Sequence, residues 1–441
     1  MTTPSAPNAS PMSTTSLSQM ITDPSCMDDY DPNSMSVDKA RQYIRQFLQP
    51  VQEIEEVALR QSLGRILAQD ILSPANVPNY DNSAMDGYAL NADDLEGDVP
   101  TRLKVIGTVF AGKSFTGHLG KGECVRIMTG GMMPTEADTV VIQEKVQVQD
   151  DIQGKSIELK ENPKRGANVR YAGEDLAIGQ IVLSTGHQIS AADLGLVASL
   201  GIAEIPVFRS LKVAFFSTGD ELVSADQPLQ SGQVYDSNRY TLFGMLNRLG
   251  VELIDLGAIP DQLEILERTL LSASDQADVI ITSGGVSVGE ADFMKQLLEK
   301  HGQVLFWKIA MKPGRPLAYG KVGHAHYFGL PGNPVAVMVT FYQFVREALL
   351  HLMGKQNINP APLFNVTCVS AIKKLTGRTE FQRGIVFADT DGMLKVKTTG
   401  AQGSAILSSM SLANCFIVLD ETVGNIEPGN TVQVQMFEGV I

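Results

Sequence analysis

Hydrophobic positions in this chain first take up a helical period just after residue 35. Residues 1–35 are rich in Ser, Thr, Pro, Asn and Met and hold few large apolar side chains, so burial cannot offset the entropy of ordering them. Ser36 is a suitable N-cap for the periodic segment that follows. We predict a disordered tail over 1–35, then a packed helix with the apolar face Ala40, Tyr43, Ile44, Phe47 and Leu48.

Between about residues 100 and 162 the pattern changes to short alternating segments separated by Gly and Asp turns. Segments 102–109, 138–142 and 156–159 show the alternation typical of half-buried strands. This stretch predicts a small β domain.

From residue 211 to about 352 the rhythm becomes strand, polar loop and helix, repeated. An apolar run at 213–216 precedes a helical pattern through Leu242, Met245, Leu246 and Leu249, and Gly250 is a suitable C-cap for it. Such alternation is typical of a parallel α/β domain. Its further predicted strands are 251–256, 279–282, 304–309 and 327–330, and its further predicted helices are 263–272 and 293–300.

Strand patterns return over roughly the last eighty residues. They occupy 384–387, 394–397 after an Asp-Gly turn, 416–419 and 432–436. The chain as a whole therefore predicts a multidomain α/β plus β protein, and its 441 residues fit about three domains.

Composition narrows the functional classes. No apolar run approaches the roughly 18 residues that a membrane span needs, and the segment before Lys39 has neither the basic nor the apolar part of a secretory signal. The four cysteines are far apart and form no CxxC pair, which suits a reducing cytoplasm. A net charge of −14 opposes nonspecific binding to nucleic acid, so an anionic ligand requires a local basic pocket.

Four loops follow predicted strands or turns of the α/β segment, where ligands bind in open sheets. Loops 217–221 and 283–292 combine hydroxyls, glycines and acids that suit phosphate and a divalent cation. The segment from Lys308 to Pro316 concentrates three cations around a Pro-Gly turn, and 330–334 leads into an apolar helix. Simple turn chemistry, or solvated lysine for the third loop, is the alternative for each.

Other familiar chemistries have little support in the sequence. The six histidines show no HExxH spacing and are interpreted as noncatalytic, and there is no GxSxG elbow. No cysteine has an identifiable activating partner. Metal-assisted phosphate chemistry is the better fit.

Nine segments, taken in order, closely resemble bacterial molybdopterin molybdenumtransferases, a family related to the E domain of gephyrin. The resemblance runs from about residue 36 to the C-terminus across every predicted domain. The segments are DNSAMDGYA, RIMTGG, GEDL, FSTGDEL, SGGVSVGEADF, FWKIAMKPGRP, GLPGNPV, FQRG and TTGAQGS.

The resemblance implies an elongated homodimer and a division into domains. A connecting domain of helical or mixed structure would comprise 36–80 and 166–206, interrupted by an inserted β domain at 81–165. An α/β molybdopterin-binding domain would cover 207–357, and a β-barrel-like domain 358–441.

The resemblance also implies a reaction. Members convert adenylylated molybdopterin and molybdate to molybdenum cofactor, with magnesium assisting and AMP released as the phosphoanhydride is hydrolysed. Contacts with other proteins of the same biosynthesis would follow. The sequence does not separate molybdate from tungstate, because both are tetrahedral dianions of similar size.

Site residues are carried over from the family by motif. The cradle for the pterin phosphate and pyrophosphate would be Ser217, Thr218, Ser283, Gly284, Gly285 and Ser287. The magnesium and pyrophosphate would be surrounded by Glu221, Asp261 and Asp292, with Asp292 the leading choice for hydrolysis. The molybdate pocket would be Lys308, Lys312, Arg383 and Ser404, since cations and a hydroxyl suit a tetrahedral dianion.

Asp86, Thr129 and Asp175 match family positions tied to activity, through the partner subunit's share of the cleft. Arg315 departs from the family pattern, which commonly has lysine there, and its planar fork keeps the charge while changing the contacts. Two alternatives stay open: a noncatalytic scaffold or carrier of molybdopterin, and an adenylylating or nucleotide-hydrolysing enzyme that shares only the binding fold. Molybdate-dependent AMP release separates them.

Overall fold

The computed structural model describes residues 34–95, 100–152, 154–285 and 293–437. The chain forms two compact units. Unit 1 comprises residues up to Glu55, Gly64–Ile66 and Val207 onward, and unit 2 comprises Glu56–Leu63 and Leu67–Pro206. Of the predicted tail, residues 1–33 lie outside the described residues, while Met35 makes a β-bridge with Ile309.

Unit 1 is built on a six-stranded sheet with the order β16-β13-β17-β21-β20-β18. All pairs from β16 to β21 are parallel, as the sequence predicted, but β20 pairs antiparallel with both of its neighbours. The sheet is therefore mixed, and β20 is a strand that the sequence pattern did not predict. The strands are β16 Glu252–Ile259, β13 Lys212–Thr218, β17 Val279–Ser283, β21 Ala325–Leu330, β20 Pro316–Val322 and β18 Gly302–Lys308.

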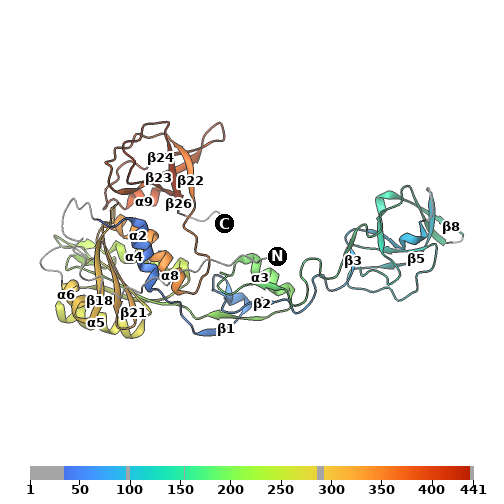
Figure 1. Ribbon diagram of the computed structural model, residues 1–441, viewed down its shortest axis with the longest axis horizontal. Coiled ribbons are helices and arrows are strands. Elements are labelled where there is room, and N and C mark those ends of the chain that lie inside the picture. The colour runs from blue at the N-terminus through green and yellow to red at the C-terminus, as the bar shows by residue number, and fades with distance from the viewer. Residues whose placement is uncertain (1–33, 96–99, 153, 286–292, 438–441) are drawn as a thin grey trace, which may run out of the picture. The chain divides into compact units, whose positions relative to one another are not determined.

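Helices cover both faces of this sheet because alternate strand residues point to opposite sides. In β13, Val213 and Phe215 belong to one core, and Ala214 and Phe216 belong to the other. Helices α5 and α6 pack on the second face, whereas α2, α4 and the helical segment after Asn333 pack on the first (Figure 1). The helices are α2 Val37–Phe47, α4 Ser237–Leu249, α5 Leu263–Gln276, α6 Phe293–His301, α7 Pro334–Thr340 and α8 Arg346–Leu352, with π-helical Phe341–Val345 between the last two.

Helix caps confirm the sequence predictions. The Ser36 side chain accepts from the backbone N–H of Lys39 at the start of α2, and Gly250 ends α4 with φ of 73°.

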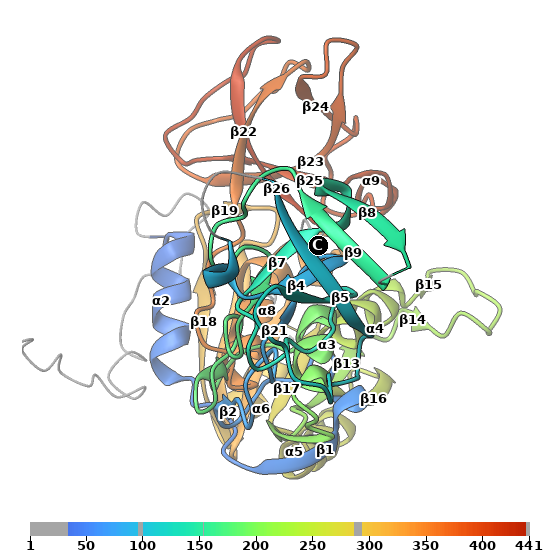
Figure 2. The same cartoon turned by 90° about the vertical axis from the view of Figure 1, so that its right-hand side faces the viewer.

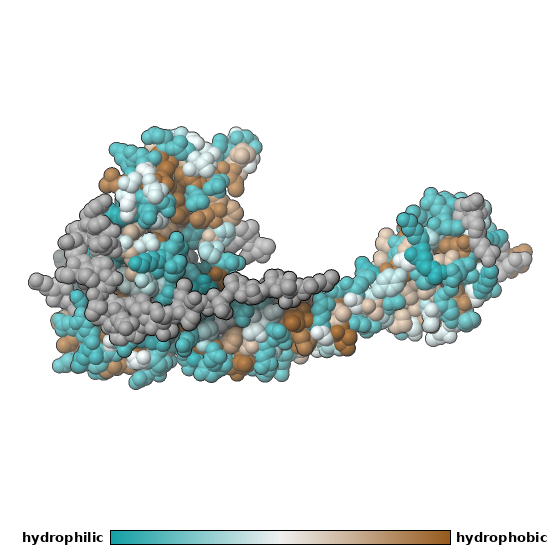
Figure 3. Space-filling view, in the orientation of Figure 1, coloured by the Kyte–Doolittle hydropathy of each residue, from teal (hydrophilic) through white to brown (hydrophobic). Residues whose placement is uncertain are grey.

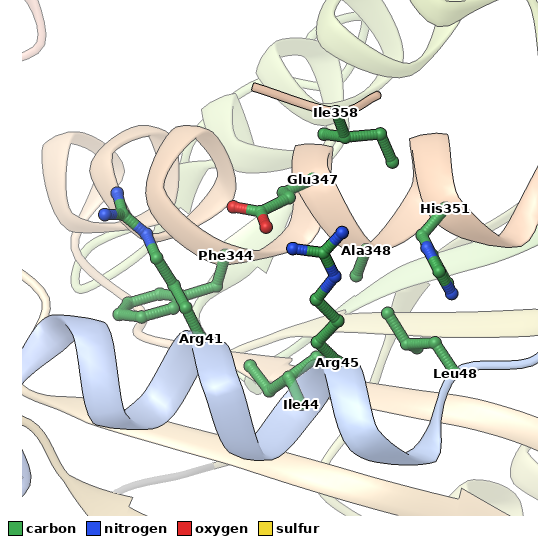
Figure 4. A pocket seen from close by; sticks show the side chains of 9 residues that line it. All are labelled: Arg41, Ile44, Arg45, Leu48, Phe344, Glu347, Ala348, His351 and Ile358. Carbon is green, nitrogen blue, oxygen red and sulfur yellow. The ribbon is translucent and has the colours of Figure 1, made fainter. Parts of the chain in front are cut away.

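The predicted connecting domain began at residue 36, whereas α2 packs in the core of unit 1. Figure 4 shows α2 facing the helix of Ala348, with Arg45 and His351 beside a cavity of about 10 Å³, room for roughly one water molecule.

The span Pro334–Leu352 is long and apolar enough to cross a membrane by length and composition. However, 72% of its most apolar window is buried inside the protein. Core packing therefore accounts for its apolar character, since Val337, Phe344 and Leu349 belong to the main core.

The last part of unit 1 is a closed barrel of five strands, which Figures 1 and 2 show around β22 and β24. Its ring closes because β23 pairs with β24 on one side and with β25 on the other. A short strand, β19 (Met311–Lys312), joins it by pairing parallel with β23. The barrel strands are β22 Leu363–Cys368, β23 Thr379–Ala388, β24 Leu394–Thr398, β25 Cys415–Leu419 and β26 Thr431–Met436, with helix α9 at Ser408–Leu412.

Unit 2 contains a six-stranded sheet of its own, with the order β7-β4-β6-β5-β9-β8. Three of its strands cover the segments predicted by alternation. The strands are β4 Gly87–Leu90, β5 Thr101–Val109, β6 Glu123–Ile127, β7 Thr139–Ile142, β8 Val146–Asp151 and β9 Gly154–Leu159. The remaining elements include β2 Ile71–Leu72 paired with β11 Ile181–Leu183, β3 Asn82–Ser83 paired with β10 Val169–Arg170, and helix α3 Ala191–Ser199.

Acid should destabilise the fold through His326, a buried residue of β21. Burial, reinforced by the positive charge of Lys321, lowers the pKa of His326 from 6.5 to about 4. Between these values the unfolded chain binds a proton that the folded chain does not, so stability is complete above pH 6.5 and falls as the pH drops toward 4. A pKa difference of this size corresponds to about 3 kcal/mol.

Urea unfolding of wild type and His326→Phe between pH 7 and pH 4 measures this contribution. The variant should lose less stability over that range than wild type. His324→Gln is the matched control, because His324 is exposed two residues away. Equal pH dependence in wild type and His326→Phe would contradict this role for His326.

Candidate functional site

Three loops follow the carboxyl ends of adjacent parallel strands in unit 1. Thr218 ends β13, Gly284 follows β17, and Gly332 follows β21. The backbone N–H of Gly284 donates to the carbonyl of Leu330 over 3.1 Å, which links the second loop to the third. These loops lie together because parallel strands present their carboxyl ends at one edge of the sheet.

Close packing explains the glycine that follows β17. Gly284 has φ of +93°, and a Cβ there would lie 2.7 Å from the carbonyl oxygen of Thr218. A side chain is therefore excluded on both conformational and steric grounds. The absence of a Cβ lets the backbone of this loop approach a ligand closely, as phosphate-binding loops do.

Asn238, near the start of α4, connects two of these loops. Its Nδ2 donates to Ser283 Oγ and to the carbonyl of Gly332, each over 2.7 Å. Both acceptors hold the amide in one orientation, so Asn238 fixes the relative positions of the ends of β17 and β21. The amide is buried and lines the cleft formed by the loops.

Carboxylates lie beside the end of β13. Glu221 and Asp261 line the cleft, and the backbone N–H of Asp261 donates to Asp220 Oδ1 over 2.9 Å. Burial, then the negative charges of Asp220 and Glu221, raise the pKa of Asp261 above 3.8. A divalent cation would relieve this repulsion and suits oxygen ligands.

The cleft receives its positive charge from Lys312, Arg315 and Arg378. Lys312 lies 3.7 Å from the buried carboxylate of Glu380, with half of its side chain exposed. This contact follows from the pairing of β19 with β23, in which Lys312 stands opposite Glu380. Arg378, at the start of the barrel, is exposed and also lines the cleft.

The barrel contributes a rim formed by Gln402, Gly403 and Ser404. The carbonyl of Ser404 accepts from the backbone N–H of Val335 over 3.0 Å, so the rim is tied to the start of α7. The resulting cleft encloses about 570 Å³. Its lining is Thr218, Gly219, Glu221, Leu222, Asn238, Asp261, Ser283–Gly285, Met311–Pro316, Pro331–Asn333, Ala336, Arg378 and Gln402–Ser404.

The structure brings many of the sequence-predicted residues into this one cleft. They are Thr218, Glu221, Asp261, Ser283, Gly284, Gly285, Lys312 and Ser404. Ser287 and Asp292 lie outside the described residues. In the described part of the chain, no group of three or more His, Cys, Asp and Glu residues is arranged to hold a metal ion.

Three predicted residues of unit 1 do not line the cleft. Ser217 is fully buried and donates to Asp236 Oδ1 over 2.9 Å. The carbonyl of Lys308 accepts from the backbone N–H of Met35. Arg383 is only 1% exposed and bonds within the barrel. The roles that the sequence suggested for these residues stay predictions.

The remaining predicted residues belong to unit 2. Thr129 donates to Asp86 Oδ1 twice, from its backbone N–H over 2.7 Å and from its hydroxyl over 2.8 Å. These bonds, backbone first, lower the pKa of Asp86. Asp175 is exposed, and its backbone N–H donates to the carbonyl of Val77.

Sequence reasoning missed Asn238 and Arg378. Asn238 belongs to the segment YDSNRY before a predicted helix, where an asparagine normally indicates only a turn or cap. Arg378 follows a Thr-Gly turn and precedes FQRG, so its position before a predicted strand was the one available signal. Which of the two arginines faces the cleft depends on the register of β23.

Comparisons with known proteins agree for every domain of the chain. Residues 35–201 match the MoeA N-terminal region (domain I and II), residues 214–351 match a probable molybdopterin binding domain, and residues 365–437 match the MoeA C-terminal region (domain IV). A molybdopterin biosynthesis MoeA protein from Pyrococcus horikoshii has a similar structure, with a TM-score of 0.75 at 32% identity over 92% of this chain and 100% of that one.

Curated relatives give the same result. The molybdopterin molybdenumtransferase of Haemophilus influenzae is 45% identical over 92% of this chain and 100% of its own length. That of Bacillus subtilis is 35% identical over 87% of this chain and 90% of its own length. Gephyrin of Dictyostelium discoideum is 35% identical over 86% of this chain, but this match spans only 59% of gephyrin.

Proposed function

Because this chain belongs to the molybdopterin molybdenumtransferase family, and is thus an enzyme of molybdenum-cofactor biosynthesis, we propose that it inserts molybdate into adenylylated molybdopterin and releases AMP. One observation carries the proposal. A single cleft combines glycine-rich strand ends, two carboxylates and three cationic residues, Lys312, Arg315 and Arg378, that come from separate parts of unit 1. The strand ends suit phosphate, the carboxylates suit a divalent cation, and the cationic side chains suit an oxyanion.

The strand-end loops would hold the phosphates of the substrate. Gly284 and Gly285 leave their backbones open to close approach, and Thr218 adds a hydroxyl. Hydrolysis of the phosphoanhydride adds water to one phosphorus and breaks its bond to the bridging oxygen, giving AMP and a pterin that keeps the terminal phosphate of molybdopterin. Asp292, by its family resemblance, would orient that water.

Magnesium would be held by Glu221 and Asp261, with phosphate oxygens and water completing its shell. The pKa of Asp261 is raised first by burial and then by the negative charges of Asp220 and Glu221, and a bound cation would offset the second of these effects. When bound, magnesium supplies positive charge to the pyrophosphate. Glu221 and Asp261 in turn orient that end of the substrate in the cleft.

Molybdate would bind at the other side of the cleft. Lys312, Arg378 and Ser404 supply two positive charges and a hydroxyl, which suit a tetrahedral dianion. Lys308 and Arg383, assigned to this pocket by resemblance, do not line the cleft and would act on it from a distance.

AMP release from adenylylated molybdopterin tests the function directly. Purified protein with magnesium should release AMP and produce a cofactor that reconstitutes an apo-molybdoenzyme, and both should depend on molybdate. Tight binding of the substrate with neither product would instead support a noncatalytic scaffold or carrier of molybdopterin.

We further propose that the protein acts as a cytoplasmic homodimer that contacts other proteins of the same biosynthesis. Unit 2 exposes an apolar patch formed by Leu72, Ile178 and Ile181, each more than half exposed, and Figure 3 shows brown surface on this part of the chain. Exposed apolar patches of this kind mark association surfaces. The dimer would let Asp86, Thr129 and Asp175 serve the partner's cleft.

Mixing two inactive variants tests this arrangement. Asp86→Asn and Asp261→Asn homodimers should each lose activity, whereas mixed dimers should recover up to about half of the wild-type rate per dimer. The reason is that one cleft in each mixed dimer would combine an intact Asp86 with an intact Asp261. Light scattering that shows a monomer, or mixtures that stay inactive, would contradict shared sites.

A further inference from the structure

Arg383 lies in β23 with its side chain on the strand face that α9 covers, opposite to the face that lines the barrel core. Only 1% of the residue is exposed. Its Nε donates to Ser409 Oγ and its Nη2 donates to the carbonyl of Gly403, each over 3.0 Å. The guanidinium therefore bonds to the rim of the cleft from behind, and it does not line the cleft itself.

The backbone of Arg383 binds the same rim. Its N–H donates to Gln402 Oε1 over 2.8 Å, and its carbonyl accepts from Gln402 Nε2 over 3.1 Å. The carbonyl also accepts from the backbone N–H of Thr399 over 3.1 Å. Side chain and backbone of one residue thus hold residues 399–403, directly before Ser404.

The charge of Arg383 explains how its contact with Gly403 would favour an anion in the cleft. No carboxylate pairs with Arg383 among the residues that the structure describes. Burial lowers the pKa of Arg383 to about 10, which leaves it protonated at neutral pH. Because the carbonyl of Gly403 accepts from Arg383, its oxygen is directed toward the guanidinium, where it does not repel an anion bound in the cleft.

Arg378 has the complementary properties. It is exposed, it lines the cleft, and it makes no ion pair within the described ranges. Four residues lie between it and Arg383, but only one of these two arginines has its guanidinium at the cleft.

We propose that Arg383 is a positioning residue that holds the rim Gln402–Ser404, and that Arg378 is the arginine that contacts the bound oxyanion. This inference rests on the proposed function for the identity of the anion. The motif alone assigns contact with the oxyanion to Arg383. The inference gives that contact to Arg378 and leaves Arg383 the role of holding the rim.

Two measurements on the full chain test the proposal: calorimetric titration with molybdate, and hydrogen exchange of the backbone at 399–406 without molybdate. Arg378→Ala should weaken molybdate binding at least about tenfold with rim exchange unchanged, and Arg378→Lys should recover part of the affinity. Arg383→Lys keeps the charge but loses the two-pronged contact. It should weaken binding at least about tenfold and also accelerate exchange in the rim.

Two further variants sharpen the result. Gln402→Ala removes the bonds to the Arg383 backbone and should behave like Arg383→Lys. Arg209→Lys is the matched control, because Arg209 makes a two-pronged ion pair with Asp278 before β17, at the opposite edge of the sheet. It should lower the melting temperature and leave molybdate affinity and rim exchange unchanged. In turnover, Arg383→Lys should raise KM for molybdate much more than it lowers kcat.

Unchanged rim exchange in Arg383→Lys would overturn the positioning role, and wild-type affinity in Arg378→Ala would overturn the contact role. A wild-type protein that binds molybdate but releases no AMP would defeat the proposed function and leave this inference standing. A wild-type protein that binds no molybdate would defeat the function and the role of Arg378, while hydrogen exchange would still decide the role of Arg383.

Discussion

Replacing Lys312 with alanine is expected to weaken molybdate binding by about 10- to 100-fold, the value of a charge-assisted hydrogen bond of roughly 1.5–3 kcal/mol. Lys312 is one of the cations that line the cleft, and it lies 3.7 Å from buried Glu380. The substitution removes the positive charge and leaves the negative charge of Glu380 without this partner. Both changes oppose the binding of a dianion.

Titration with molybdate and the KM for molybdate measure the effect. Lys312→Arg should retain most of the affinity because it keeps the charge. The double variant Lys312→Ala with Glu380→Gln should bind better than Lys312→Ala alone, because it removes the uncompensated carboxylate. Wild-type affinity in Lys312→Ala would show that the oxyanion binds elsewhere.

Replacing Asp261 with asparagine is expected to reduce molybdate-dependent AMP release by at least about 100-fold, in the range seen when an electrostatic group of an active site is removed. Asparagine has nearly the same size as the Asp261 side chain, but it lacks the negative charge that would hold magnesium. The magnesium concentration needed for half-maximal activity should rise as well. Asp275→Asn, on the exposed surface of α5, is the control and should behave as wild type.

The pH dependence of the wild-type enzyme provides an independent test of Asp261. Its pKa is raised above 3.8, first by burial and then by Asp220 and Glu221, and only the ionised form would hold a cation. Activity should therefore fall as the pH drops through this raised pKa. Asp220→Asn removes one like charge and should move the acidic limb to lower pH. If the acidic limb of the activity profile is unchanged in Asp220→Asn, protonation of Asp261 does not cause the loss of activity at low pH.

Local patterns were sufficient to predict most elements of the fold. Ser36 and Gly250 marked helix ends correctly because caps depend on a few neighbouring residues. The apolar runs of β13 and β17 were recognisable because strands buried on both faces read as continuous hydrophobic stretches. By contrast, β20 was missed, since PLAYGKV begins with proline and contains a glycine, and only pairing with β18 and β21 makes it a strand.

The candidate site shows the same division. From its motifs alone the sequence identified the strand-end loops, Glu221 and the lysine turn at 312, because each group is contiguous along the chain, whereas Asp261 was suggested only by the family resemblance. Only the tertiary structure decided that Asn238 joins two loops, that β19 pairs with β23, and that Arg378 faces the cleft while Arg383 is buried behind it. These contacts join residues from distant segments, and a side chain's burial and hydrogen-bond partners depend on packing that no local pattern records.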